Sequence, residues 1–233
     1  MYQPQVNILT RTLVGFEALI RWSNNDLGSV SPGEFIPIAE VHSTIDKITT
    51  WVINESLETI RYWLDHDFVF NRLSFNVTIN DLKTRGFREQ LLQSCRQYAV
   101  DPSYIGIEIT ERQPLNLDRR TKDIINDLRN DGFDIILDDF GSGYANFDTL
   151  NEFYIHTIKV DRVMTDNIIR EDFQKIFGGI LSLASSLDMY VIIEGVETKQ
   201  QCDILNAIGF HVMQGYYFSK PLNIEATMLF EIP

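Results

Sequence analysis

The sequence predicts an α/β protein in which parallel strands close into a single (β/α) barrel. Short apolar runs alternate with amphipathic segments along the 233 residues, which is the order expected of a parallel sheet covered by helices. The length is close to the ~250 residues that such a barrel usually needs. No stretch has the composition of a linker. A doubly wound open sheet is the alternative, and one closed barrel is the simpler solution.

The expected elements alternate from one end of the chain to the other. We expect eight strands, near Gln3–Leu9, Val14–Trp22, Leu73–Ile79, Ile105–Thr110, Asp134–Asp139, Thr157–Asp161, Tyr190–Val196 and Phe210–Phe218. We expect helices at Pro32–Ala39, Ser43–Leu64, Ile79–Tyr98, Leu117–Asp131, Asp166–Ser186, Thr198–Ile208 and Ile224–Phe230.

Local signals set several of these helix boundaries. Ser31 precedes Pro32, and serine is a preferred N-cap while proline suits the first helical position. Thr198 stands three residues before Gln201, the spacing of a capping box. Gly209 follows a predicted helix and suits a left-handed C-terminal stop, as does Gly132.

The stretch Asp134–Tyr144 is the first candidate for a functional site. The apolar run Ile135–Leu137 meets two adjacent carboxylates, Asp138 and Asp139, and a glycine-containing loop follows. Ligands in parallel α/β folds collect at the carboxyl ends of strands. Two neighbouring carboxylates there are unfavourable unless a cation binds with them. A helix cap with an ion-paired partner explains one aspartate more readily than two, so the pattern favours a metal site.

Polar residues recur on one face of successive predicted strands. Side chains alternate between the two faces of a strand, so Glu108 lies opposite the isoleucines of Ile105–Thr110. A core selected for stability alone would carry branched apolar residues at the inward positions. The polar residues that we expect on the inner face or the rim are Glu17, Asn76, Glu108, Asp138, Asp139, Lys159, Glu194 and Gln214.

This set of side chains indicates metal-assisted phosphodiester hydrolysis. Carboxylate and amide oxygens suit Mg²⁺ or Mn²⁺ rather than a structural zinc ion. Two such ions can lower the pKa of a bound water and clamp the attacking and leaving oxygens. Lys159 can stabilise charge on the phosphate or orient the water. Its alternative role is that of a counter-ion for Asp161 or for the other acids.

Bulk properties exclude several classes of protein. The formal net charge of −13 argues against sequence-independent binding to long nucleic acid, which needs a basic surface. The two cysteines, Cys95 and Cys202, have no metal-ligand spacing and indicate buried or half-buried free thiols in a reducing compartment. We find no signal peptide and no apolar run of ~18 residues, so we expect no membrane contact from this segment.

Further motifs carry a resemblance to a known family. The sequence Glu17-Ala18-Leu19 is followed by Ile20-Arg21-Trp22. Other short motifs are Tyr2–Pro4, Phe35–Glu40, Glu108–Glu111, Asp138–Tyr144, Ile158–Asp161, Glu194–Thr198 and Gln214–Pro221. With these motifs in this order, the chain resembles the EAL-domain cyclic di-GMP phosphodiesterases of bacteria, nearly from end to end.

The resemblance implies both a fold and an activity. It implies a TIM-like (β/α)8 barrel whose first strand is antiparallel to the rest. Residues 1–233 are then a single EAL-type phosphodiesterase domain, of the kind found within longer multidomain signalling proteins. The implied reaction is hydrolysis of cyclic di-GMP to linear pGpG, which lowers a bacterial second messenger of biofilm formation and motility.

The resemblance also implies roles for individual residues. Two Mg²⁺ or Mn²⁺ ions are expected in the active enzyme, and Ca²⁺ is expected to inhibit. The implied metal ligands are Glu17, Asn76, Glu108, Asp138, Asp139 and Glu194. The implied catalytic residues are Lys159, Glu194, Glu17 and Gln214, which hold or activate the water. The implied substrate contacts are Gln3, Glu17, Leu19, Arg21, Asp161 and Gln214, with Arg21 directed toward phosphate.

Regulation is expected at the loop after Asp139, which couples assembly to activity in the family. The implied regulatory residues are Glu111, Phe140, Gly141, Ser142 and Gly143. The segment Ala145–Asp148 departs from the small serines and leucine that are commoner there, so gating and dimer coupling stay open. The expected partners are a second copy of the chain and a covalently linked sensor or GGDEF domain. The expected location is the cytoplasm, with tethering to a membrane only through other domains.

Two other functions compete with active hydrolysis. One is a catalytically weak or inactive receptor that binds cyclic di-GMP without cutting it. The other is a different metal-assisted barrel enzyme, such as one that uses enolate chemistry. The complete set of acids, together with Lys159 and Glu194, favours the active phosphodiesterase.

Overall fold

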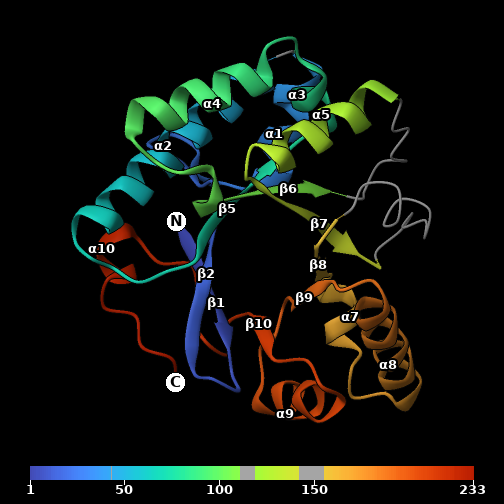
Figure 1. Cartoon of the computed structure of the whole chain (residues 1–233). Helices are drawn as coiled ribbons and strands as arrows, with labels where there is room; N and C mark the ends of the chain where they lie inside the picture. Colours follow the sequence, from blue (N-terminus) through green and yellow to red (C-terminus); the bar gives the residue numbers. More distant parts are fainter. Residues whose placement is uncertain (43, 111–118, 142–154) are drawn as a thin grey trace.

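Eight strands close into a barrel and the helices lie outside it (Figure 1). The computed structural model describes residues 1–42, 44–110, 119–141 and 155–233. Around the barrel the strands follow the order β1 (Tyr2–Asn7), β10 (Val212–Gln214), β9 (Tyr190–Ile193), β8 (Thr157–Val160), β7 (Asp134–Phe140), β6 (Ile105–Thr110), β5 (Arg72–Val77) and β2 (Thr12–Ala18). The predicted closed barrel is therefore confirmed, and the open sheet is excluded.

The first strand runs against its neighbours, as the resemblance implied. β1 pairs antiparallel with both β2 and β10, while every other pair in the barrel is parallel. The physical cause is the short connection between β1 and β2. Asn7 folds this turn, because its side-chain oxygen accepts hydrogen bonds from the backbone N–H groups of Leu9 and Thr10. A connection this short can join only antiparallel strands.

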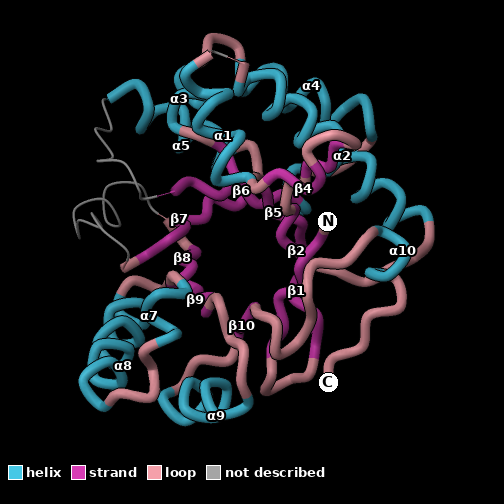
Figure 2. Tube along the Cα trace, turned by 180° about the vertical axis from the view of Figure 1, so that it is seen from behind, coloured by secondary structure: helices cyan, strands magenta, loops and turns pink. Residues whose placement is uncertain are grey.

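Helices surround the ring of strands (Figure 2). Those described are α1 (Pro32–Val41), α2 (Ile45–Asp65), α3 (Ile79–Lys83), α4 (Phe87–Tyr98), α5 (Arg119–Asn130), α7 (Arg162–Asp166), α8 (Glu171–Ser186), α9 (Lys199–Ile208) and α10 (Ile224–Thr227), with a short 3₁₀ turn at Pro102–Tyr104. The predicted capping box is present at Thr198, at the start of α9, and Ser31 caps α1 as predicted and also forms a capping box with Glu34. Gly132 and Gly209 adopt positive φ, as predicted for helix stops.

Several element boundaries differ from the prediction. β2 ends at Ala18, and Trp22 instead belongs to a separate hairpin of β3 (Trp22–Asn24) and β4 (Gly28–Val30). The apolar run continues past the barrel strand, so hydrophobicity alone did not mark the end. The predicted helix Ile79–Tyr98 is split into α3 and α4 at Gly86, whose φ of 86° is unfavourable for other residues.

Two further differences shorten predicted elements. The helix predicted to begin at Asp166 begins at Glu171 as α8, and the strand predicted over Phe210–Phe218 is limited to β10. After β10 the backbone N–H of Ser219 bonds back to the carbonyl of Gly215, so the chain turns here rather than extending.

The core lies between the barrel and its helices. Trp63 of α2 is completely buried and its ring packs near those of Phe16, Phe68 and Phe70. The isoleucines of β6 are also buried on the helix side. The inward positions are polar, as the alternation predicted, and include the fully buried Glu108 and Lys159.

Candidate active site

Lys159 is the centre of a cluster of acids inside the barrel. Its side chain is fully buried. The ammonium nitrogen lies 2.7 Å from a carboxylate oxygen of Glu194, 2.9 Å from Glu108, 3.1 Å from Glu17 and 3.3 Å from Asp138. Buried ion pairs persist only when the charges are satisfied from several sides. Lys159 is thus a counter-ion for four acids, and Asp161 is not among them.

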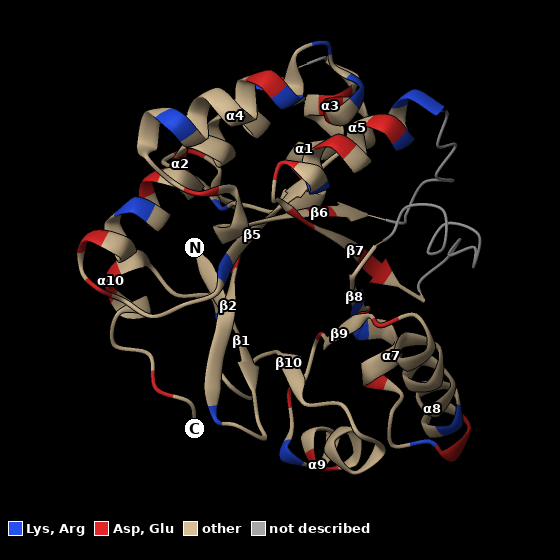
Figure 3. Ribbon diagram, in the orientation of Figure 1, with Lys and Arg blue, Asp and Glu red and all other residues tan. Residues whose placement is uncertain are grey.

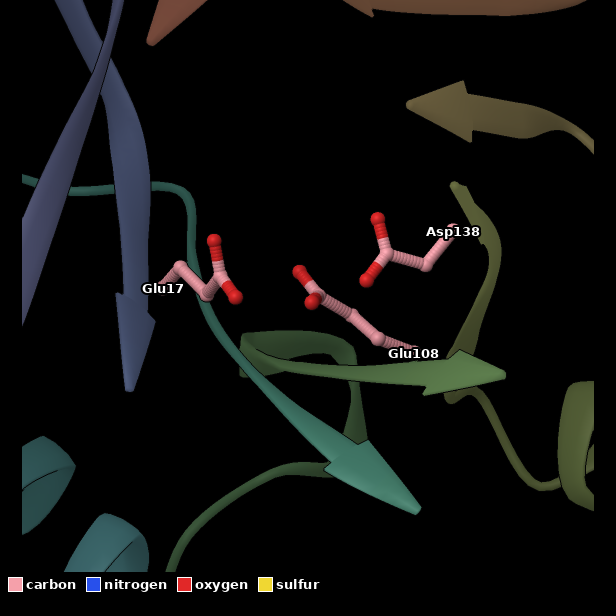
Figure 4. A group of neighbouring side chains, drawn as sticks. All are labelled: Glu17, Glu108 and Asp138. Carbon is pink, nitrogen blue, oxygen red and sulfur yellow. The ribbon is translucent and has the colours of Figure 1, made fainter. Parts of the chain in front are cut away.

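The acids converge because they lie on neighbouring strands. Glu17 on β2, Glu108 on β6 and Asp138 at the end of β7 point toward one another (Figure 4). β5 fills the interval between β2 and β6, and from it Asn76 donates a hydrogen bond to Glu17 at 3.2 Å and to Glu108 at 3.3 Å. One hydrogen-bonded network therefore joins side chains from β2, β5 and β6, and the Lys159 ammonium nitrogen, 3.3 Å from Asp138, links β7 to it.

The donor set fits divalent cations. Glu17, Glu108 and Asp138 each offer a carboxylate oxygen within 4.8 Å of the others, and so do Asp138, Asp139 and Glu194. Asp138 is common to both groups. Clusters of hard oxygen donors are the ligands that Mg²⁺ and Mn²⁺ prefer.

Burial makes the negative charge of this cluster unfavourable. It raises the pKa of Glu108 well above its ordinary value, with repulsion from Glu17 adding to the effect. Burial also raises the pKa of Asp138, and that of Glu194 to about 8, against the opposing attraction of Lys159. For Glu17 burial is outweighed, because Lys159 and Gln214 stabilise the charged form and lower its pKa.

The same acids hold Lys159 in its charged form. Burial alone would lower the pKa of its ammonium group, but attraction by Asp138, Glu108, Glu17 and Glu194 raises it well above the ordinary value. The cluster therefore contains a permanent positive charge. Such a charge allows the acids to approach one another before any other cation binds.

A cavity of about 650 Å³ opens above the cluster. Nine of the sequence-predicted site residues line it, namely Gln3, Glu17, Leu19, Arg21, Asn76, Asp138, Asp139, Glu194 and Gln214. Glu108 and Lys159 are fully buried and do not line it. These two residues lie beneath the cavity, where they contact the acids that line it.

Two of the predicted site residues, Arg21 and Asp161, are not part of the acid cluster. Arg21 follows β2 rather than sharing a strand face with Glu17, and its guanidinium donates to the carbonyl of the adjacent Ile20. It still lines the cavity and is exposed there. Asp161 caps α7 by accepting a hydrogen bond from the backbone N–H of Val163, and it does not line the cavity.

Part of the predicted regulatory loop lies outside the described residues. Glu111, Ser142 and Gly143 are in this category. Phe140 is buried at the end of β7, and Gly141 follows with a φ of 91°. The predicted coupling of this loop to assembly stays a prediction.

Some residues of the site had no predicted role. Ser74 on β5 is one of them, and its hydroxyl donates to Glu108 at 2.5 Å. Helix α1 contributes a wall of the cavity through Pro32, Gly33, Ile36, Pro37 and Glu40. The three-to-four residue spacing of these positions was the available signal, because it places them on one helix face.

Comparison with known proteins identifies the family. A model described as the EAL domain matches residues 1–221. The chain belongs to the EAL domain family. Its spacing of acids, its barrel and its reversed first strand are thus features of an EAL domain.

Curated relatives of this EAL domain include longer proteins. It is 33% identical over 226 residues to the oxygen sensor protein DosP of Escherichia coli, covering 97% of the chain and 28% of DosP. It is 34% identical to the probable cyclic di-GMP phosphodiesterase PdeG of the same species, covering 95% of the chain and 44% of PdeG. The EAL domain thus spans less than half the length of these relatives.

A solved structure shares the fold of this EAL domain. The EAL enzyme Bd1971 in its cAMP- and cyclic-di-GMP-bound form has a TM-score of 0.92 at 30% identity, covering 98% of this chain and 63% of that one. Another, the PaMucR phosphodiesterase in complex with c-di-GMP, has a TM-score of 0.90 at 28% identity, covering 97% and 92%.

Proposed function

We propose that this protein is a metal-dependent phosphodiesterase that hydrolyses cyclic di-GMP to linear pGpG. The observation that carries the proposal is the gathering of Glu17, Glu108, Asp138 and Glu194 around Lys159 beneath an open cavity. An EAL domain with this complete set of acids has the groups that the reaction needs. Relatives named as cyclic di-GMP phosphodiesterases, at 31% and 34% identity, support the same substrate.

The proposed cofactors are two Mg²⁺ or Mn²⁺ ions. Glu17, Asn76, Glu108 and Asp138 would hold one ion, and Asp138, Asp139 and Glu194 the other. When bound, the ions would lower the pKa of a water molecule and offset negative charge on the phosphate. Ca²⁺ prefers more ligands in a looser geometry, so we expect it to compete for the site and to support hydrolysis poorly.

The chain's own residues would prepare the attacking water. Glu194, which lines the cavity, would accept the water proton in its deprotonated form. Lys159 remains charged and holds Glu194 in position through their 2.7 Å contact. Gln214, which already donates to Glu17 at 2.5 Å, keeps that carboxylate fixed.

The proposed substrate contacts fit a cyclic dinucleotide. Arg21 is an exposed cation at the cavity and suits a phosphate oxygen. Gln3 and Leu19 lie in the same lining. The apolar wall formed by Ile36 and Pro37 of α1 suits the flat face of a guanine. For Asp161 we propose an indirect part, through its cap on α7.

We also propose an assembly and a setting for the protein. By likeness to the longer relatives, residues 1–233 are one domain of a multidomain signalling protein with a linked sensor or GGDEF domain, acting as a homodimer in the cytoplasm. No helix within the described parts of the chain is long and apolar enough to cross a bilayer. Acidic and basic side chains are interspersed on outer helices such as α4 and α5 (Figure 3), and with the formal net charge of −13 this suits a solvated surface rather than long nucleic acid.

Product analysis tests the proposed function. Purified protein is incubated with cyclic di-GMP in Mg²⁺, in Mn²⁺ or in EDTA, and the nucleotides are separated by chromatography. We expect pGpG in both metals and none in EDTA. Tight binding of cyclic di-GMP without any pGpG would contradict hydrolysis and favour the receptor alternative.

A further inference from the structure

Gln5 lies inside the barrel next to the acid cluster. It is completely buried on β1, where it is the register partner of Gln214 on β10 and of Gly15 on β2. Because side chains alternate along β1, Gln5 shares the inward face with Gln3. Gln5 is therefore within reach of the residues that surround Glu17.

The hydrogen bonds around Gln214 follow a fixed order. A carboxylate only accepts hydrogen bonds, so Gln214 must turn its NH₂ group toward Glu17, and Nε2 lies 2.5 Å from Glu17 Oε2. The carbonyl oxygen of Gln214 then points the other way. It accepts a hydrogen bond from Nε2 of Gln5 at 3.0 Å.

When Gln5 donates this bond, its own carbonyl oxygen is left without a hydrogen-bond partner. That oxygen, Gln5 Oε1, is buried and has no hydrogen-bond partner within the described ranges. Rotating the Gln5 amide by half a turn would bring two carbonyl oxygens face to face and leave Gln214 without a donor. Leaving a buried acceptor unpaired is unfavourable, so the contact with Gln214 determines the orientation of Gln5.

We propose that Gln5 is a positioning residue that locks the Gln214 amide with its NH₂ group toward Glu17. This inference rests on the proposed function, in which Glu17 is a metal ligand. Without a donor at position 5, the Gln214 amide loses the contact that holds its carbonyl oxygen, and only the contacts of its NH₂ group with Glu17 and Gln3 still oppose rotation. A rotated amide would direct its carbonyl oxygen at the Glu17 carboxylate, and its 3.3 Å contact from Nε2 to Gln3 would also be lost.

Metal binding by Gln5→Met tests the inference. Methionine is similar in length and lacks the donor. Titration calorimetry on metal-stripped protein should show Mn²⁺ binding weakened roughly fivefold to tenfold, the scale of one buried neutral hydrogen bond. Because Gln5 acts through Gln214, the same change should have little further effect in a Gln214→Met background. Gln5→Asn keeps the amide but is too short, so it should behave like Gln5→Met and replaces it if that variant does not fold.

Thr227→Val is the matched control. It removes a buried hydrogen bond that Thr227 accepts from Trp63 at 3.0 Å, away from the acid cluster. It should lower thermal stability and leave Mn²⁺ affinity unchanged. Unchanged affinity in Gln5→Met and Gln5→Asn, or effects of Gln5→Met and Gln214→Met that simply add, would overturn the positioning role. Wild-type protein that binds no Mn²⁺ would instead overturn the metal site of the proposed function, and this inference with it.

Discussion

The ammonium nitrogen of Lys159 lies 2.7 Å from a carboxylate oxygen of Glu194 inside the barrel. Glu17, Glu108 and Asp138 surround the same nitrogen at distances up to 3.3 Å. Each of these acids alone would lose hydration with little compensation. Lys159 therefore stabilises the buried acid cluster, in addition to its proposed part in catalysis.

Lys159→Met should destabilise the metal-free protein strongly. Removing one member of a buried ion pair leaves uncompensated charge and costs roughly 3–5 kcal/mol. Urea denaturation in EDTA measures the loss, and saturating Mg²⁺ should recover part of it because a cation again offsets the acids. Lys199→Met is the control, since the ion pair of Lys199 with Asp203 is exposed. Equal, small losses in both variants would contradict the counter-ion role.

Glu17→Gln should nearly abolish hydrolysis of cyclic di-GMP. The change keeps the size of the side chain but removes a charged oxygen from the group formed by Glu17, Glu108 and Asp138. We expect the rate to fall by at least roughly 100-fold, because even residues that only support metal ligands can cost that much. The rate of pGpG formation at saturating Mn²⁺ measures the effect. Glu58→Gln, on the exposed face of α2, is the control and should keep the wild-type rate. A wild-type rate in Glu17→Gln would contradict the role of Glu17 as a metal ligand.

The metal-free protein should lose stability as pH rises from about 6 to 8. Burial raises the pKa of Glu194 to about 8 in the folded chain, from the ordinary value of 4.5. Between these values the folded state binds more protons than the unfolded state, so the free energy of unfolding falls with increasing pH. One such group contributes at most ~1.4 kcal/mol per pH unit.

Denaturation in EDTA at pH 6 and pH 8 measures this slope. Glu194→Gln cannot titrate, so its slope should be flatter than that of the wild type. Saturating Mg²⁺ should also flatten the wild-type slope, because metal binding favours the deprotonated ligands. Identical slopes in wild type and variant would mean that Glu194 does not carry the effect.

The alternation of strands and helices predicted the barrel, but not the orientation of its first strand. That orientation follows from the short turn held by Asn7, and it was expected only by resemblance. Side-chain alternation placed Glu108 and Lys159 inward correctly. It left open which acids Lys159 meets, because Glu17, Glu108, Asp138 and Glu194 come from different strands or strand ends that only the closed barrel brings together. Arg21 was expected beside Glu17 on one strand, yet β2 ends before it.

Asp139 should be replaced with less loss by Asn than by Ala. Its φ of 59° lies in the left-handed region, which asparagine tolerates and which costs most other residues roughly 1–2 kcal/mol. Both variants remove one carboxylate from the group formed by Asp138, Asp139 and Glu194. Unfolding in EDTA should therefore rank Asp139→Asn as more stable than Asp139→Ala. The reverse ranking would argue that backbone conformation does not limit this position.

A manganese anomalous difference map of the crystallised protein tests the central claim most directly. The account predicts two peaks, one among Glu17, Glu108 and Asp138 and the other among Asp138, Asp139 and Glu194. Metal bound only on the outer surface, with these carboxylates held by Lys159 alone at saturating Mn²⁺, would contradict it.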